Sequence, residues 1–475
     1  MPMPTRVVDV GSEDGLNGLR LLVTNGQMGK YLTLSHRWSS RPFTTLLQQN
    51  LEQLQESLPV EGLPQTFLDA IRVTKTLGVR YLWIDSLCII QNDKTDWERE
   101  SNLMSSVYEN AYCTLAATCS TNGSSFLERK ETPNKIPVPC SDDDVVYLVS
   151  NQPTATPKDE IGAAELNHRG WTMQERILSR RVIHFAESQL YWECRTQARA
   201  QAGNLFSTGS IGDFVFPLPI ITKVLGIVGE TVPTDMVFQH LWVSIASYYS
   251  TCHLTHEGDR IPALLGLASM LGRFTTRTFV RGHWFGNGLA LSSCLLWTVV
   301  GSNLMVPATR VNPSWSWIGL GGEVTFHTTE RSAQTSPTLL WGVEQGEDEC
   351  FDVLIQGKLL DVVAPVANSE SRVVPVFNKS EQHYTQGSPI GNVAFDFVND
   401  RPSALTCLYM YTDVVGYAIV LFLADGGGKA MDSDSESLID TGEDGVYRRV
   451  GIGSLNRHKG LHLFTDESES IFRLR

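Results

Sequence analysis

The chain has 475 residues, which is enough for two or three domains with substantial cores. Its hydrophobic share of 42% and its charged share of 19% are typical of a globular protein. The formal net charge of −14 argues against nucleic acid as a partner, because that binding relies on Lys and Arg side chains meeting phosphates.

The cysteines and the apolar stretches indicate where the protein works. Nine cysteines, an odd number without Cys-x-x-Cys or metal-ligand spacing, are typical of free thiols in a reducing compartment. No apolar stretch reaches the roughly 18 residues that span a bilayer. The N-terminus lacks a basic start followed by an apolar run. We therefore expect a cytoplasmic protein with no bound metal and no membrane partner.

Three apolar runs in the first part of the chain predict strands of one α/β sheet. These runs cover residues 31–35, 79–84 and 112–118. The helical patterns that precede or follow them cover about residues 44–57, 64–77 and 96–111, with Thr95 and Glu98 at capping-box spacing before the last one. Because helical crossovers join the strands, we expect a parallel sheet flanked by helices. Ligands bind outside the carboxyl ends of the strands in such sheets.

The rest of the chain is predicted from shorter patterns. Residues 1–30 are poorly patterned and are predicted to be peripheral, and residues 121–165 to be an insertion or a long loop. Further helices are expected at residues 171–179, 236–250 and 259–271, and strands at 182–185 and 190–194. The last third is predicted to be β-rich, with apolar runs at residues 314–318, 351–355, 414–423 and 446–452.

These patterns divide the chain into three expected parts. We expect an α/β domain over residues 1–200, a helical segment over residues 201–290 and a β-rich region over residues 291–475. Within the last part, residues 425–445 are acidic and rich in Gly and Ser, which predicts a mobile hairpin loop.

Several segments resemble a known family. Residues 31–38 (YLTLSHRW), 63–101 and 166–185 (LNHRGWTMQERILSRRVIHF) resemble the three signature blocks of the fungal heterokaryon incompatibility (HET) domain. The motifs DRIPALLGLA, PSWSW and YRRVG also resemble downstream segments of such proteins. Two departures are Ser39, where the family usually has Gly, and His36, where Tyr is common.

The resemblance implies a fold and a chemistry. HET domains are themselves similar to Toll/interleukin-1 receptor (TIR) domains, which implies a TIR-like, flavodoxin-like sheet. Several TIR domains cleave the nicotinamide–ribose bond of NAD with one glutamate, and they carry a Trp-Cys-x-x-Glu pattern. Trp171 and Glu175 have that spacing, with Thr172 in the place of the cysteine. NAD would then be a substrate, and no cofactor is expected.

The expected site combines the strand ends with this helix. Glu175 and Asp85 are the candidate catalytic carboxylates, although either could instead pair with a surface cation or cap a turn. The candidate substrate-binding residues are Ser35, Arg37, Trp38, Cys88, Arg169 and Trp171. The arginines could hold a diphosphate or bridge to a carboxylate, the tryptophans could stack on a base or belong to the core, and Cys88 could be a nucleophile or a buried thiol.

Three functions follow from these observations. The first is hydrolysis of NAD or a related nucleotide in fungal incompatibility or cell-death signalling. The second is a small-molecule step of fungal secondary metabolism, such as a non-redox rearrangement, condensation or hydrolysis. The third is a non-catalytic signalling module that associates with a partner or with copies of itself as a homo-oligomer.

Overall fold

The computed structural model of the 475-residue chain describes most of its first half and a smaller share of its second half. The described residues are 1–11, 18–128, 135–139, 145–149, 156–194, 196–202, 235–286, 295–300, 312–320, 322–327, 338–345, 351–364, 373–378, 389–396, 402, 404–412, 417–425, 446–455, 464 and 469–474.

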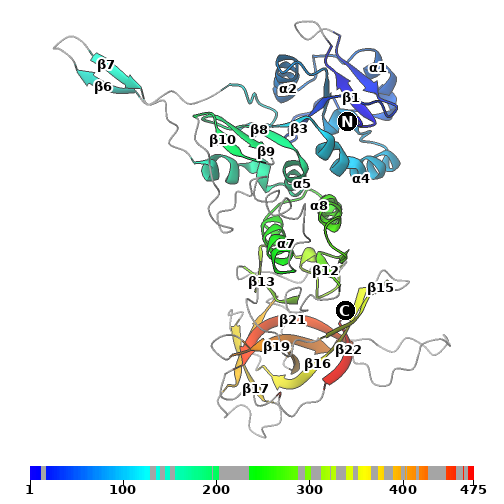
Figure 1. The fold of residues 1–475 in the computed structure, drawn as a ribbon, viewed down its shortest axis with the longest axis vertical. Coiled ribbons are helices and arrows are strands. Elements are labelled where there is room, and N and C mark those ends of the chain that lie inside the picture. Colours follow the sequence, from blue (N-terminus) through cyan, green and yellow to red (C-terminus); the bar gives the residue numbers. More distant parts are fainter. Residues whose placement is uncertain are drawn as a thin grey trace. The chain divides into compact units, whose positions relative to one another are not determined.

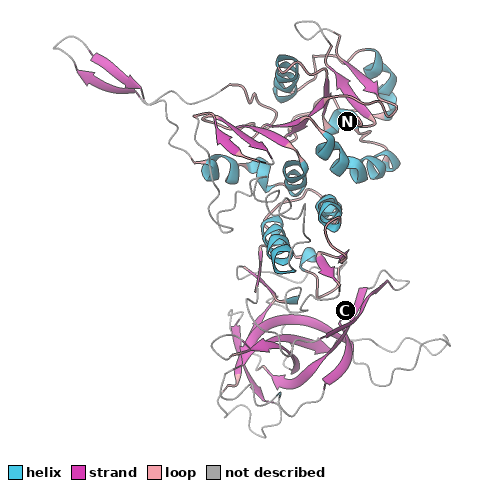
Figure 2. Cartoon of the chain, in the orientation of Figure 1, coloured by secondary structure: helices cyan, strands magenta, loops and turns pink. Residues whose placement is uncertain are grey.

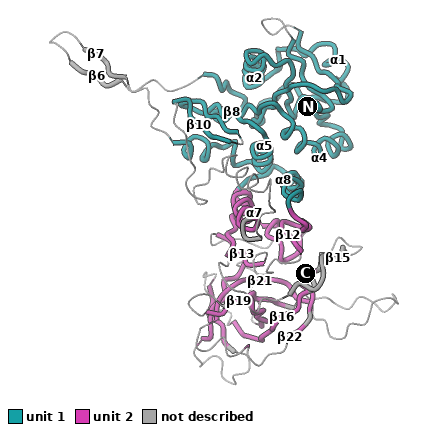
Figure 3. Tube along the Cα trace, viewed as in Figure 1, with its two compact units in different colours: residues 1–233, 252–274 teal, residues 234–251, 275–475 magenta. Residues whose placement is uncertain are grey.

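The chain forms two compact units that are each discontinuous in sequence (Figure 3). Unit 1 consists of residues 1–233 and 252–274, and unit 2 of residues 234–251 and 275–475. The boundaries expected near residues 200 and 290 stay a prediction.

Unit 1 is built on an eight-stranded mixed sheet with the strand order β10-β9-β8-β5-β3-β4-β1-β2 (Figure 1). Its strands are β1 (Arg6–Asp9), β2 (Arg20–Val23), β3 (Tyr31–Ser35), β4 (Tyr81–Trp83), β5 (Cys113–Ala116), β8 (Arg181–Phe185), β9 (Leu190–Cys194) and β10 (Ala198–Ala200). The four central strands, β4, β3, β5 and β8, pair in parallel, as the helical crossovers predicted. The strands on both sides pair antiparallel, so the parallel strands that were expected form the centre of a mixed sheet.

The N-terminal residues form part of this sheet, which corrects the expectation that residues 1–30 are peripheral. β1 is fully buried and pairs with β4 on one side and with β2 on the other. Of these two partners, β4 lies far away in sequence, and the four residues of β1 show no alternation because all of them are buried. A local pattern therefore could not identify it.

Helices cover both faces of the sheet. They are α1 (Leu51–Glu56), α2 (Gln65–Thr76), α3 (Asp85–Cys88), α4 (Lys94–Asn110) and α5 (Gly170–Leu178), with short helical turns at Gln48–Asn50 (η1), Lys158–Gly162 (η2) and Glu165–His168 (η3). α4 and α5 pack on the face of Tyr31 and Thr114: the Tyr31 hydroxyl donates to the Val107 carbonyl at 2.6 Å, and Thr114 Oγ1 lies 2.5 Å from Ser179 Oγ. α2 packs on the other face (Figure 1).

Two local predictions are corrected. The first helical turn of α4 is capped by Asp93, whose carboxylate accepts from the Thr95 and Asp96 amides, and not by Thr95. Residues 121–165 contain more than a loop, because β6 (Lys135–Pro139) and β7 (Val145–Val149) form an antiparallel hairpin before the turn η2.

Unit 2 contains the helix α7 (Asp235–Ser250) and is otherwise mostly β-structure (Figure 2). Its strands are β11 (Thr278–Val280), β12 (His283–Phe285), β13 (Trp297–Val299), β14 (Val324–Phe326), β15 (Thr338–Gln345), β16 (Phe351–Val363), β17 (Val373–Asn378), β18 (Gly391–Phe395), β19 (Ala404–Thr412), β20 (Ala418–Asp425), β21 (Val446–Leu455) and β22 (Glu469–Leu474). The β-rich last third is therefore confirmed. Residues 314–318 form no strand, because Ser316 caps the turn η5 (Trp317–Gly319).

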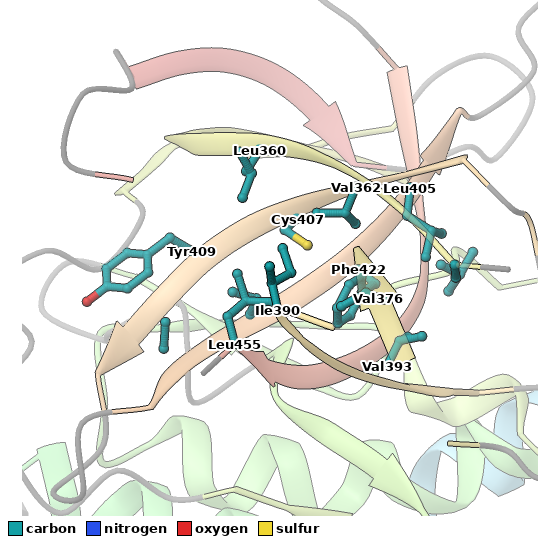
Figure 4. Packing of buried hydrophobic residues seen from close by; sticks show 14 of the residues in the cluster. Leu360, Val362, Val376, Ile390, Val393, Leu405, Cys407, Tyr409, Phe422 and Leu455 are labelled. Atoms are coloured by element: carbon teal, nitrogen blue, oxygen red, sulfur yellow. The ribbon is translucent and has the colours of Figure 1, made fainter. Parts of the chain in front are cut away.

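Six of these strands pair in a closed cycle, β16-β17-β18-β21-β20-β19 and back to β16. Successive side chains of a strand point to opposite faces of the sheet, so alternate residues of each strand pack in two different hydrophobic clusters. Leu405, Cys407 and Tyr409 of β19 pack in one cluster (Figure 4), whereas Leu408 and Met410 pack in another with Trp315. Burial on both faces explains why these strands are continuous apolar runs.

Two further expectations concern the membrane and the acidic loop. Within the described residues, no helix is long and apolar enough to cross a membrane. The acidic loop expected at residues 425–445 lies outside the described residues except for Asp425.

Candidate functional site

The candidate site lies where the central parallel strands of unit 1 end. β3 ends at Ser35, and α3 begins at Asp85, shortly after the end of β4. The Asp85 carboxylate accepts from the Ser86 amide at 2.7 Å. The Asp85 side chain therefore stabilises the turn after β4 and is also part of the candidate site. Arg169 precedes α5, whose first residue is Gly170.

Glu175 lies on α5, on the side that packs against the sheet. Its side chain is buried, and the residue keeps only 5% of its surface exposed. The Ser179 hydroxyl donates to the Glu175 carbonyl and also contacts Thr114 of β5, which holds this turn of α5 against the sheet. α5 therefore presents Glu175 to the end of β3.

Two polar atoms at this point lack a partner in hydrogen-bonding geometry within the described part of the chain. They are Glu175 Oε2 and Ser35 Oγ, and both are buried. The Ser35 hydroxyl is nevertheless close enough to the carboxyl group to lower its pKa. Buried polar atoms without partners are rare because each one costs free energy. The pair therefore points to a role other than folding.

Burial dominates the electrostatics of Glu175. Loss of water raises the pKa of its carboxyl group to about 7, although Arg169 and the Ser35 and Tyr108 hydroxyls favour the charged form. The nearby Asp85 charge raises the pKa further. Glu175 is thus divided between its charged and neutral forms near neutral pH.

Two side chains that interact with Asp85 remain neutral. Burial lowers the pKa of His36 to about 4, because it outweighs the attraction of the Asp85 charge. Burial raises the pKa of Tyr108 well above its ordinary value, and Glu175 and Asp85 add to this effect. The Tyr108 hydroxyl donates to the Leu34 carbonyl at 3.4 Å.

Asp85 forms the more accessible part of the site. Its side chain is 25% exposed, and its Oδ1 lies 3.9 Å from His36 Nδ1. The Trp38 indole N–H donates to Asp85 Oδ2 at 2.8 Å, and Trp38 itself is 39% exposed. A buried carboxyl group and a partly exposed one therefore share one site in different environments, the arrangement in which two acids take different roles.

Arg169 connects the strand end to the helix. Its guanidinium donates to the carbonyl oxygen of His36, and its charge lowers the pKa of Glu175. The structure thus brings together five of the eight expected site residues: Ser35, Trp38, Asp85, Arg169 and Glu175.

The other three expected residues have different surroundings. Arg37 is exposed and pairs with Glu165. Trp171 is partly buried, and its indole N–H donates to Asp259 Oδ2 at 3.3 Å. Cys88 has no exposed surface, and burial raises the pKa of its thiol to about 12, so it is neither accessible nor ionised. Of the two roles expected for Cys88, these surroundings favour the buried thiol.

Sequence reasoning did not place Tyr108 in the site. Tyr108 belongs to the apolar stripe of α4, which gives its ring to the core, and only its hydroxyl reaches the carboxyl group. His36 was noted as a departure from a family pattern and was not among the expected site residues. Its ring packs edge-on against Phe67, with 5.0 Å between the ring centroids, which a local sequence pattern does not encode.

The described residues contain no group of three or more His, Cys, Asp or Glu side chains that could hold a metal ion. The chemistry that the site itself offers is acid–base and electrostatic. A carboxyl group that titrates near pH 7 can stabilise a positive charge when ionised or donate a proton when neutral.

One comparison with known proteins places part of the chain in a family. Residues 31–175 match the family model described as heterokaryon incompatibility protein (HET). This span begins at β3 and ends at Glu175, so it contains the whole cluster. Comparisons with curated proteins and with solved structures give no match.

Proposed function

The chain is a heterokaryon incompatibility domain protein, and we propose that its domain cleaves the N-glycosidic bond of NAD or a related nucleotide. The observation that carries the proposal is the buried Glu175 carboxyl group, whose Oε2 has no partner in hydrogen-bonding geometry among the described residues, although the Ser35 and Tyr108 hydroxyls lie near the carboxyl group. Burying such a group costs folding free energy. A module that only associated with other proteins would gain nothing from this cost, whereas an enzyme requires the carboxyl group for its chemistry.

The proposed reaction is a hydrolysis. The bond between ribose C1′ and the nicotinamide nitrogen breaks, and its electron pair leaves with nicotinamide as a neutral molecule. Positive charge develops on the ribose, and the ionised Glu175 carboxylate stabilises it. A water molecule then adds to C1′ and releases one proton, which gives ADP-ribose.

The remaining residues of the cluster bind the nucleotide in this proposal. Arg169 offers the diphosphate the guanidinium donors that it does not give to His36. The exposed ring of Trp38 stacks on a base, and Asp85 accepts from ribose hydroxyls.

Incubation of the pure full-length protein with NAD, followed by chromatographic measurement of nicotinamide, tests the proposal. We expect release by the wild type and a decrease of about 100-fold or more in the Glu175→Gln variant, because the charge is lost from the transition state. Glu98→Gln is the matched control, since Glu98 lies exposed on α4 and should leave the rate unchanged. No release at high protein concentration, or equal release by Glu175→Gln, would overturn the proposal.

A further inference from the structure

The segment Cys252–Phe274 has an unusual place in the chain. It belongs to unit 1, whereas the residues on both sides of it belong to unit 2 (Figure 3). It contains the short turn η4 (Glu257–Arg260) and the helix α8 (Pro262–Gly272). The chain therefore leaves unit 1, forms α7 in unit 2, and returns for this one segment.

The returning segment binds the start of α5 through its backbone. The His253 amide donates to the His168 carbonyl at 2.6 Å, and the Gly170 amide donates to the His253 carbonyl at 2.9 Å. Together they form a short parallel bridge between His253 and Arg169. Gly170 is the first residue of α5, so His253 satisfies one of the amides that a helix start leaves without a partner inside the helix.

The same segment also contacts the following turn of α5. The Trp171 indole donates to Asp259, and the Gly266 amide of α8 donates to the buried Gln174 side chain at 3.1 Å. The next residue is Glu175. A Cβ atom added to Gly266 would lie 2.2 Å from Gln174 Oε1, so α8 fits against α5 at this point because residue 266 is a glycine. The segment thus holds Arg169, in front of Glu175, and Gln174, directly beside it.

The other end of the connection is anchored in unit 2. Ser250, the last residue of α7, accepts from the Val324 amide of β14 at 2.8 Å and donates to the Ser247 carbonyl at 2.6 Å. Only Thr251 separates this anchor from Cys252, whose thiol contacts the Asn167 carbonyl in unit 1. A displacement of the end of α7 is therefore passed over very few bonds to the residues that precede α5.

We propose that segment 252–274 is the positioning element for Glu175 and the route by which unit 2 regulates the site. Hydrogen bonds join Ser250 to β14 and His253 to the start of α5, and the backbone of residues 250–253 links these two anchors covalently. Its effect on catalysis rests on the proposed function, whereas the mechanical coupling does not.

Hydrogen exchange of the full-length protein tests this coupling without reference to activity. Ser250→Ala removes the anchor in unit 2, and Gly266→Ala forces α8 from Gln174. We expect both variants to raise exchange in residues 170–178 about fivefold, the effect of losing one hydrogen bond on a local opening equilibrium. In the NAD assay they should lower kcat more than they change KM, because Glu175 is displaced while the exposed binding residues stay in place.

Matched controls are available for both changes. Gly258→Ala adds a Cβ atom with nothing within 4 Å, and Thr406→Ala removes a single hydroxyl hydrogen bond, to Asp361, elsewhere in unit 2. Neither should change exchange in α5. If Gly266→Ala fails to fold, Gln174→Ala removes the same hydrogen bond without a clash. Exchange in β3, which should not rise, reports on the fold of unit 1.

The outcomes separate the two proposals. If hydrogen exchange in α5 is equal in Ser250→Ala and Thr406→Ala, the regulatory route is overturned. If exchange in α5 is no faster in Gln174→Ala than in Gly258→Ala, the positioning role is overturned. A rise in β3 as large as that in α5 also overturns the proposal, because it reports a general loss of stability. If no form of the protein releases nicotinamide, the proposed function fails, and the exchange data still decide the coupling.

Discussion

Glu175 should give the reaction a characteristic pH dependence. Its pKa of about 7 means that the carboxylate, the form that stabilises positive charge, is the minor form at pH 6 and the major form at pH 8. We expect kcat/KM for NAD to rise roughly tenfold between pH 6 and pH 8, in proportion to the ionised fraction of Glu175, and then to level off. A pH series of initial rates measures this. A profile that falls over this range would mean that Glu175 acts as a proton donor instead.

The same carboxyl group should lower the stability of the protein at high pH. Because the folded state holds the proton up to a pKa of about 7, whereas the unfolded state loses it near the ordinary value of 4.5, stability falls as the pH rises between these values. Glu175→Gln should therefore raise the Tm at pH 8, on the order of 5 °C, and change it little at pH 4.5. Thermal unfolding at both pH values measures this, and a gain of equal size at both would contradict it.

The cluster shows how far residue-scale prediction reaches. Ser35 and Asp85 were expected because side chains that follow parallel strands meet at one edge, and Glu175 because its spacing from Trp171 matches a pattern. The opposite environments of Glu175 and Asp85 could not be expected, because burial depends on the depth of α5 against the sheet. Likewise, the Trp38 bond to Asp85 joins two loops that only the fold brings together.

Among the elements, α4 offers a direct test of a corrected prediction. The spacing of Thr95 and Glu98 predicted a capping box, but Asp93 accepts from the first free amides of the helix. Asp93→Ala should lower the Tm of unit 1 by about 2–4 °C, because those amides lose their acceptor. Thr95→Ala, the matched control on the same turn, should leave the Tm within about 1 °C. Calorimetry that ranks the two variants in the opposite order would restore the original prediction.

Local sequence patterns explain which strands could be predicted, and non-local pairing or short length explains which strands were missed. β3, β4 and β5 alternate with helices whose apolar stripes are wide, so a local pattern identified their direction as well as their extent. β1 was missed because its pairing with β4 is non-local, and β10 because only three residues form it. The antiparallel strands at both sides of the sheet could not be derived from crossovers, since hairpins and long connections produce them.

At the scale of the whole molecule, each unit has its own core and its own buried ion pair. Arg176 of α5 binds Glu193 of β9 in unit 1, with nitrogen–oxygen distances of 2.9 and 2.5 Å. In unit 2, Arg449 binds Asp396 at 3.1 and 3.0 Å and lies over the Trp297 ring. The division of these pairs between discontinuous units could not be predicted, because no composition change in the sequence marks where the chain crosses at residues 234, 252 and 275.

These ion pairs allow the units to be destabilised one at a time. Removing one partner of a buried pair leaves an uncompensated charge and costs about 3–5 kcal/mol. We expect two calorimetric transitions in the wild type, with Glu193→Gln lowering the temperature of one and Asp396→Asn that of the other. The destabilisation caused by Glu193→Gln should become smaller below pH 4.5. The Arg176 charge holds the pKa of Glu193 near 2 in the folded protein, so ionisation of this carboxyl group stabilises the wild type above pH 4.5, and this stabilisation is lost as the pH falls from 4.5 toward 2. If both substitutions shifted a single common transition, the units would unfold together. The returning segment would then be one part of a shared structure, and α5 would respond to Asp396→Asn as strongly as to Ser250→Ala.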